Sequence, residues 1–131
     1  MKPDDLTRLR HMLDASLEAV SFLGNIDADG LAENRLVCQA VVRSLEIVGE
    51  AASQVSLTYR DAHTEVPWHM IIGMRNRIVH AYFDIDYEVV EKTVNQDLPP
   101  LIQKLKKLID EYKRTQSPQN IEQEKGDKIE A

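Results

Sequence analysis

The sequence predicts an all-α fold, an antiparallel bundle of four or five helices. Two observations predict it. Apolar residues recur at steps of three and four along most of the chain, which is the spacing that places side chains on one face of a helix. The chain also has only five glycines and five prolines in 131 residues, too few for the frequent turns of a strand-rich fold.

The first predicted helix begins at Pro3, because a proline followed by the acids Asp4 and Asp5 suits the first turn of a helix. It spans about twenty residues and ends at the turn-forming segment GNIDADG, residues 24–30. Its apolar stripe is expected to face the core and consists of Leu6, Leu9, Met12 or Leu13, Leu17 and Val20.

A second long helix is predicted over residues 31–56, followed by a polar loop over residues 57–67. Pro67 ends this loop and begins a third helix, which is predicted over residues 68–79. Trp68 at its start is expected in the core. The buried stripe predicted for the second helix is Leu36, Ala40, Val41, Leu45, Val48, Ala52 and Val55.

The fourth helix is predicted to run to about Tyr112 and to begin at Asp84 or Asp86, whose side chains can accept hydrogen bonds from unpaired backbone amides. Its apolar positions are spaced like those of the other helices. Pro99 and Pro100 lack backbone N–H groups, so we expect a kink where they interrupt the hydrogen-bond ladder.

Polar residues dominate the end of the chain, residues 115–131, and leave little apolar surface to bury. Such a segment does not gain enough from burial to offset the entropy lost on ordering, so a disordered tail is expected. The remaining length suffices for one domain with a sizeable core. We therefore divide the chain into a helical domain over residues 1–114 and a C-terminal tail.

Composition and charge limit the classes of function. The net charge of −6 makes the protein a poor general binder of nucleic acid, so any RNA site must be a small basic site rather than a basic face. No apolar run approaches the ~18 residues of a membrane-spanning helix, and the N-terminus does not resemble a secretory signal. Cys38 is the single cysteine, which excludes an internal disulfide; it is expected to be a small buried hydrophobe. We therefore expect a cytoplasmic protein with no membrane partner.

The richest chemistry lies in the stretch MRNRIVHAYFDID, residues 74–86. Asn76 and His80 are four residues apart and share a helix face. Arg75 and His80 are five apart and point roughly 140° away from one another on an ideal helix. One straight helix therefore cannot aim both at a single atom. Either the helix loosens near its end, or two copies meet across a two-fold axis and each contributes both groups to one cleft.

Arginine beside histidine suits phosphodiester chemistry. A guanidinium grips phosphate oxygens and stabilises developing charge, and an imidazole can take a proton from a ribose 2′-hydroxyl or donate one to the leaving oxygen. This chemistry requires no metal, and no cofactor is expected. The structural alternative is a histidine favoured at a helix C-terminus beside solvated arginines. A metal site at His80, Asp84 and Asp86 is less favoured, because the aspartates are better explained as helix caps.

The segment RNRIVHAY, residues 75–82, resembles the R-x4-H-x-Y motif of the HEPN superfamily, specifically the HepT-like toxins. Arg75, His80 and Tyr82 fall on its three named positions, and an asparagine directly after the arginine is also typical. AVVRSLEIVGEAA, residues 40–52, resembles the second-helix signature of the same group, and VPWHMIIGMRN resembles its approach to the motif. The resemblance covers about residues 5–112.

This resemblance implies a homodimeric all-helical bundle that cleaves RNA without a metal. Arg75 and His80 of both protomers would be the catalytic residues of a cleft at the dimer interface. Asn76 is expected to orient the substrate or the histidine, and Arg77 to add phosphate affinity. The implied partner is a minimal nucleotidyltransferase antitoxin, which would silence the toxin by transferring AMP groups to Tyr82.

Two alternatives remain open at this point. One is a non-catalytic helical module that docks a nucleotidyltransferase or a nucleotide, and the other is a structural dimer. Arg43, Glu46 and Glu50 are spaced to form ion pairs along one edge of the second helix, where they would support the arginines of the cleft or lie on a solvated face. His11 and His63 are expected to be isolated and exposed.

Overall fold

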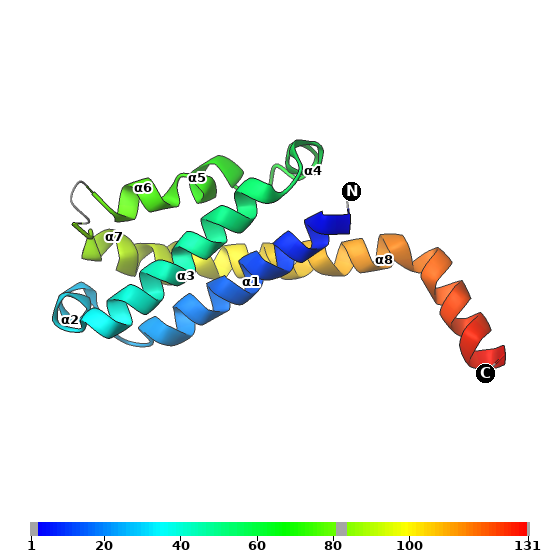
Figure 1. Ribbon diagram of the computed structural model, residues 1–131, viewed down its shortest axis with the longest axis horizontal. Coiled ribbons are helices and arrows are strands. Elements are labelled where there is room, and N and C mark those ends of the chain that lie inside the picture. Colours follow the sequence, from blue (N-terminus) through cyan, green and yellow to red (C-terminus); the bar gives the residue numbers. More distant parts are fainter. Residues whose placement is uncertain (1–2, 81–83, 131) are drawn as a thin grey trace.

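The computed structural model describes residues 3–80 and 84–130, with side chains described for residues 4–80 and 84–115. This part of the chain is an all-α bundle, which confirms the predicted fold class (Figure 1). α1 and α3 run antiparallel side by side, α8 packs against α1, and α5 and α6 pack against α3. The elements are α1 Pro3–Leu23, α2 Ala28–Glu33, α3 Arg35–Gln54, α4 Leu57–Ala62, α5 Trp68–Ile72, α6 Met74–Ile78, α7 Tyr87–Lys92, the π-helical turn η2 Thr93–Asp97, and α8 Leu98–Glu130.

The first helix has the predicted bounds, but its buried face is rotated from the predicted stripe. Leu9 and Met12 are fully buried as expected, whereas Leu17 and Val20 are 41% and 38% exposed. The helix contacts both α3 and α8, and small inward side chains permit this close approach. The other buried positions of α1 are Asp5, Ala15, Ser16, Ala19 and Leu23.

The predicted second helix is divided into α2 and α3. Asn34 lies between them, and its side-chain oxygen accepts a hydrogen bond from the backbone N–H of Val37 at 3.1 Å, which starts a new helix. Leu36 in the first turn of α3 is 81% exposed, so its place in the predicted stripe is wrong. The rest of the stripe faces inward, with Ala40 half-buried and Val41, Leu45, Val48, Ala52 and Val55 fully buried.

The segment predicted as a polar loop contains a short helix, α4. The hydroxyl of Ser56 caps it by accepting from the backbone N–H of Tyr59 at 3.3 Å. The backbone N–H and the hydroxyl of Ser56 also donate to the buried carboxylate of Asp5, at 2.8 and 2.7 Å. These bonds tie the start of α4 to the start of α1. Trp68 is buried as predicted, and its indole N–H donates to the carbonyl of His63 at 2.9 Å.

The predicted third helix breaks at Gly73 into α5 and α6. The backbone N–H of Gly73 still donates to the carbonyl of His69 at 3.0 Å, but a new helical turn begins at Met74. A second glycine brings α3 close to this region. A Cβ built at Gly49 would lie 3.1 Å from the carbonyl oxygen of Ile71, so the lack of a side chain there permits the close approach of α3 to α5.

Asp86 caps the fourth helix, which resolves the predicted choice between two aspartates: its Oδ1 accepts from the backbone N–H of Val89 at 3.2 Å. Where a proline kink was predicted, the chain forms the π-helical turn η2 immediately before Leu98, Pro99 and Pro100. Since the two prolines cannot donate to preceding carbonyls, the altered turn accommodates the lost bonds.

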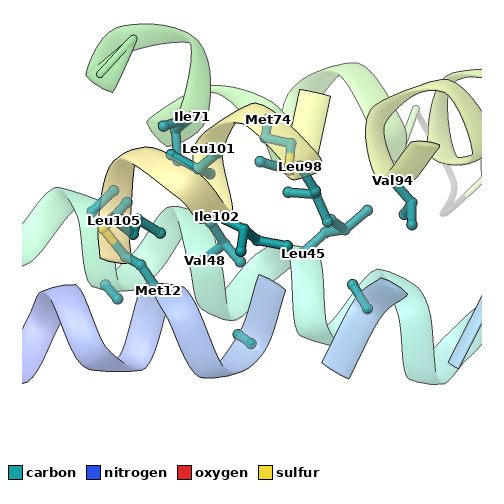
Figure 2. Packing of buried hydrophobic residues seen from close by; sticks show 14 of the residues in the cluster. Met12, Leu45, Val48, Ile71, Met74, Val94, Leu98, Leu101, Ile102 and Leu105 are labelled. Carbon is teal, nitrogen blue, oxygen red and sulfur yellow. The ribbon is translucent and has the colours of Figure 1, made fainter. Parts of the chain in front are cut away.

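The core lies between α1, α3 and α8. Figure 2 shows Met12 of α1, Leu45 and Val48 of α3, and Ile102 and Leu105 of α8 in this cluster. Each large apolar side chain buried in this way contributes about 1.5–3 kcal/mol. The three long helices therefore supply the packed frame on which the shorter α5, α6 and α7 are held.

The end of the chain continues the last helix. The backbone of α8 extends through Glu130, so the division between a helical domain and a tail at residues 115–131 stays a prediction. Among the helices of the described residues, none is long and apolar enough to cross a membrane.

Candidate functional site

The helix carrying Arg75 ends before His80 is reached. α6 ends at Ile78, and Val79 forms an antiparallel bridge with Ile85. The backbone N–H of His80 donates to the carbonyl of Asp84 at 2.7 Å. His80 therefore belongs to a hairpin-like return of the chain rather than to a helix. The helix therefore ends before His80, as in one of the two arrangements that the sequence left open. Convergence of His80 on Arg75 stays a prediction, because His80 is not among the described residues that line the groove beside Arg75.

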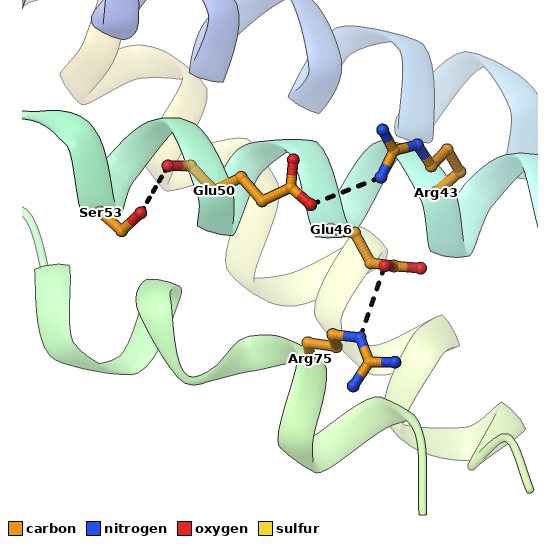
Figure 3. Close-up of polar contacts among 5 residues, drawn as sticks. All are labelled: Arg43, Glu46, Glu50, Ser53 and Arg75. Carbon is orange, nitrogen blue, oxygen red and sulfur yellow. Dashed lines mark hydrogen bonds and ion pairs between the residues drawn. The ribbon is translucent and has the colours of Figure 1, made fainter. Parts of the chain in front are cut away.

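Arg75 is held by an acid from the neighbouring helix. Its Nε lies 3.4 Å from Oε2 of Glu46 on α3 (Figure 3). The Arg75 side chain is 51% exposed and that of Glu46 is 26% exposed, so the guanidinium is still accessible. The predicted pairing along the edge of α3 is also present, with Arg43 Nη1 3.5 Å from Oε1 of Glu50. Glu46 thus supports the arginine of the motif rather than an arginine of its own helix.

His80 is paired with Asp86. Its Nε2 lies 3.3 Å from Oδ2 of Asp86, while Oδ1 of the same carboxylate caps α7. The backbone N–H of Val89 lowers the pKa of Asp86, and the imidazole of His80 lowers it further. The carboxylate is therefore ionised at neutral pH, and its contact with Nε2 can orient the imidazole ring. Asp86 was one of the two caps that the sequence predicted, but its second contact, with His80, was not predicted.

A groove of about 940 Å³ opens beside Arg75 between α3 and the α6–α7 return. Arg43 and Glu46 of α3, which the sequence offered as supports of the cleft arginines, line this groove, whereas Arg35 and Gln39 were not predicted. The signal was available, because Arg35, Gln39 and Arg43 are spaced four residues apart. The described residues that line the groove include three arginines and two acids, which are Arg35, Arg43, Arg75, Glu46 and Asp84.

The other predicted site residues are placed differently. Asn76 is exposed. Arg77 lines a separate, smaller pocket of about 150 Å³ between the α5–α6 segment and α8, so it does not share the groove of Arg75 within one protomer. Tyr82, predicted as the modification point, lies outside the described residues. The substrate-binding roles of Asn76 and Arg77 stay predictions.

The remaining candidates have structural surroundings. Cys38 is buried as predicted, and burial raises the pKa of its thiol. His11 is exposed as predicted, but His63 is not isolated: its ring centroid lies 4.2 Å from that of Tyr59, and Nδ1 lies 3.3 Å from Glu65. In the part of the chain that is described, no three histidine, cysteine or acidic side chains gather as they would around a metal ion. Metal independence stays a prediction.

Comparison with known proteins identifies the family of the chain. The family model described as "Ribonuclease HepT-like" matches residues 12–108. A protein of Methanocaldococcus jannaschii that bears the name "Putative RNase" is 34% identical over 100 residues, which cover 76% of this chain and 92% of the relative.

Two further relatives have similar names. A "Putative RNase" of Caldanaerobacter subterraneus subsp. tengcongensis is 30% identical over 105 residues, covering 80% of this chain and 94% of the relative. A "Probable ribonuclease HepT" of Thermococcus cleftensis is 44% identical over 69 residues, covering 53% of this chain and 63% of the relative. No solved structure matches the chain. The chain therefore belongs to the HepT-like ribonuclease family.

Proposed function

We propose that the protein is a metal-independent endoribonuclease and the toxin of a toxin–antitoxin system. The observation that carries this proposal is the pairing of His80 with Asp86 at the point where α6 has ended, next to a groove that Arg75 lines. A histidine oriented by a carboxylate and an arginine accessible to phosphate are the two groups that cleavage of RNA through its 2′-hydroxyl requires.

The chemical step assigns one role to each side chain. An imidazole of His80 accepts the proton of a ribose 2′-hydroxyl, and the oxygen attacks the adjacent phosphorus. The bond from phosphorus to the 5′-oxygen breaks, and that oxygen receives a proton, which leaves a 2′,3′-cyclic phosphate and a 5′-hydroxyl. The Arg75 guanidinium stabilises the charge that builds on the phosphate oxygens. Asp86 acts through His80 and is a positioning residue.

A homodimer would supply the second proton-transfer group. In a two-fold arrangement each protomer contributes one Arg75 and one His80, so that one imidazole serves as base and the other as acid. Asn76, which is exposed, would orient the substrate or the histidine across this cleft, and Arg77 would add phosphate affinity from its own side of α6.

The test of the activity is cleavage of RNA in the presence of EDTA. The purified protein should cut single-stranded RNA and leave 2′,3′-cyclic phosphate ends. His80→Ala should lower the rate by at least about 100-fold, as expected for loss of a general acid–base group. Arg75→Ala should also lower it strongly, whereas Arg10→Ala, on the exposed side of α1, is the matched control. Cleavage by His80→Ala at the rate of the unmodified protein would exclude the proposal.

The regulation that we propose is AMP transfer to Tyr82 by a minimal nucleotidyltransferase antitoxin. An added phosphate group near the cleft would repel RNA and block it sterically. Co-expression with such an enzyme should add mass in multiples of AMP to the unmodified protein and not to Tyr82→Phe, and it should relieve a growth defect caused by the protein alone. Modification without any effect on growth or RNA cleavage would favour the alternative, a non-catalytic module that docks the enzyme.

A further inference from the structure

The α3 wall of the groove carries two arginines that the proposed chemistry does not use. Arg35 and Arg43 lie eight residues apart on one face of α3, about 12 Å along the helix axis, with Gln39 between them. We propose that they form, together with Arg75 on the opposite wall, a phosphate track for single-stranded RNA that leads to the scissile bond. This inference rests on the proposed ribonuclease function and names how the substrate is held.

The groove is less acidic than the protein as a whole. Three guanidinium groups, from Arg35, Arg43 and Arg75, and two carboxylates, from Glu46 and Asp84, are among the described lining residues. A third carboxylate, from Glu50, pairs with Arg43 from outside the lining, so the groove is near neutral. The chain as a whole carries −6. Because RNA affinity depends on local positive charge, this groove is a favourable place for phosphates on an otherwise acidic surface.

The arginines of the track are held loosely enough to exchange partners. Arg43 and Glu50 are 3.5 Å apart, and both side chains are mostly exposed. The 3.4 Å pair of Arg75 and Glu46 is also partly exposed. Exposed pairs of this kind are weak and screened by salt, so a phosphate with good geometry can replace the carboxylate.

Arg35 is held by an uncharged partner, so no carboxylate offsets its positive charge in this contact. With the Gln39 amide turned so that its oxygen faces Arg35, that oxygen accepts from Arg35 Nε at 3.1 Å and from a terminal guanidinium nitrogen at 3.3 Å. A neutral amide keeps the side chain along α3 but does not neutralise it. Arg35 therefore offers a positioned cation to an incoming phosphate.

The size of the groove favours a single strand. Its volume of about 940 Å³ is close to the upper end of small-ligand pockets, about 300–1,000 Å³. This holds a short unstacked stretch rather than a duplex, which proteins recognise over a broad, shallow surface. Tyr87, which is partly buried against the core, also lines the groove.

The test measures binding separately from cleavage. The probe is a fluorescent 12-nucleotide single-stranded RNA with 2′-O-methyl groups, which keeps every phosphate but lacks the attacking hydroxyl. Its affinity for the intact protein is measured by anisotropy at several salt concentrations. Arg35→Gln and Arg43→Gln should each weaken binding about tenfold at low salt. Each should also reduce the slope of log affinity against log salt by about 0.7, and the double variant by about 1.4.

The control is Arg10→Gln, which removes the same charge from the exposed side of α1 and should leave the slope unchanged. Circular dichroism of each variant verifies that the helices remain. Equal slopes for the groove variants and the control would overturn the phosphate track, while cleavage by the unmodified protein would leave the ribonuclease proposal standing. A 12-base-pair duplex that binds as tightly as the single strand would overturn the single-strand assignment. Absence of RNA binding by the intact protein would overturn the inference as a whole.

Discussion

The packed frame of α1, α3 and α8 and the site segment from α6 to the start of α7 are built in opposite ways. The frame consists of long helices whose apolar side chains are buried, including Leu45, Val48 and Leu105. The site segment consists of a five-residue helix, which buries Met74 and Ile78, and the bridge of Val79 with Ile85. Its polar side chains form one ion pair, at 3.4 Å, and one histidine–carboxylate contact, at 3.3 Å, between partly exposed groups. Stability is therefore concentrated in the frame, and accessible charge in the site segment.

Because of this difference, stability and activity can be altered separately by substitutions in the two regions. Exposed ion pairs contribute little to the free energy of unfolding, about 0–1 kcal/mol each, whereas a buried leucine contributes several times more. Substitutions of the exposed polar residues in the site segment should therefore alter activity more than stability, and substitutions of buried residues in the frame should do the reverse.

The largest effect on stability is expected for Leu45→Ala in the frame. Leu45 is 1% exposed at the centre of the core, so its truncation leaves a cavity and should lower the free energy of unfolding by about 2–5 kcal/mol. Urea unfolding followed by circular dichroism measures the loss. Leu36→Ala makes the same chemical change at an exposed position of the same helix and should cost less than about 0.5 kcal/mol. Equal losses for the two variants would contradict the assigned core.

The next stability prediction concerns alkaline pH and Tyr59, a core residue of α4. Burial raises the pKa of Tyr59 from 10.0 to about 12, and the carboxylates of Glu65, Glu111 and Asp5 contribute. The neutral phenol is therefore favoured in the folded state. The stabilisation that the neutral phenol gives to the folded state is fully present below pH 10 and is lost as the pH rises through about 12. The loss in the free energy of unfolding is on the order of 2 kcal/mol. Unfolding of the protein and of Tyr59→Phe should be compared from pH 8 to 11.5; identical pH dependences would show that Tyr59 ionises normally.

The third prediction separates the two roles of Asp86. Asp86→Ala removes the cap of α7 and should cost about 1 kcal/mol, whereas Asp86→Asn retains a capping oxygen and should cost less. Both should slow RNA cleavage by about tenfold or more, because neither retains the charge beside His80. If Asp86→Asn cleaves RNA at the normal rate, the carboxylate acts only as a cap.

The pH dependence of the cap has a defined sign. The pKa of Asp86 is lowered in the folded state, so its stabilisation is present above the ordinary value of 3.8 and is lost as the pH falls through the lowered value. Asp86→Asn should remove this part of the acid dependence. Unfolding measured between pH 5 and the acid transition tests it, and an acid limb unchanged by the substitution would contradict the assignment.

The smallest effect on stability is expected for Glu46→Gln. The amide keeps the shape of the side chain but removes the charge beside Arg75, and the loss in the free energy of unfolding should be below about 1 kcal/mol. RNA cleavage should change more than stability does, since the guanidinium is no longer held by a carboxylate. Glu18→Gln, at an exposed acid of α1 that does not line the groove, is the matched control. If Glu46→Gln lost much stability but cleaved RNA at the normal rate, the contact of Glu46 with Arg75 would serve stability rather than activity.

Much of the helical frame could be predicted from the order of residues. Val41, Leu45 and Val48 repeat at three- and four-residue steps and are buried as expected. Leu17 and Leu36 show why such prediction is incomplete. Periodicity places residues on a helix face, but the direction in which neighbouring helices lie decides which part of that face is covered.

The residues of the candidate site could be predicted from their types, but the contacts that those residues make could not. Arg75 and His80 were selected from their chemistry and from a family motif, but the sequence left open how they relate in space. Arg75 is contacted by Glu46 of α3, which lies 29 residues earlier in the chain (75−46). His80 is contacted by Asp86 at the start of α7, which lies 6 residues later (86−80). Such contacts depend on where the chain returns, and local spacing does not encode that.

The order of residues by itself determined the helical class, the buried character of Cys38 and Trp68, and the residues able to carry phosphodiester chemistry. These follow from local periodicity and from the chemistry of individual side chains. Only the tertiary structure decided that α6 ends before His80, that Asp86 is shared between a helix cap and an imidazole, and that Arg35 and Arg43 face the same groove as Arg75. Those relations arise because distant segments are packed together, and packing is a property of the whole fold.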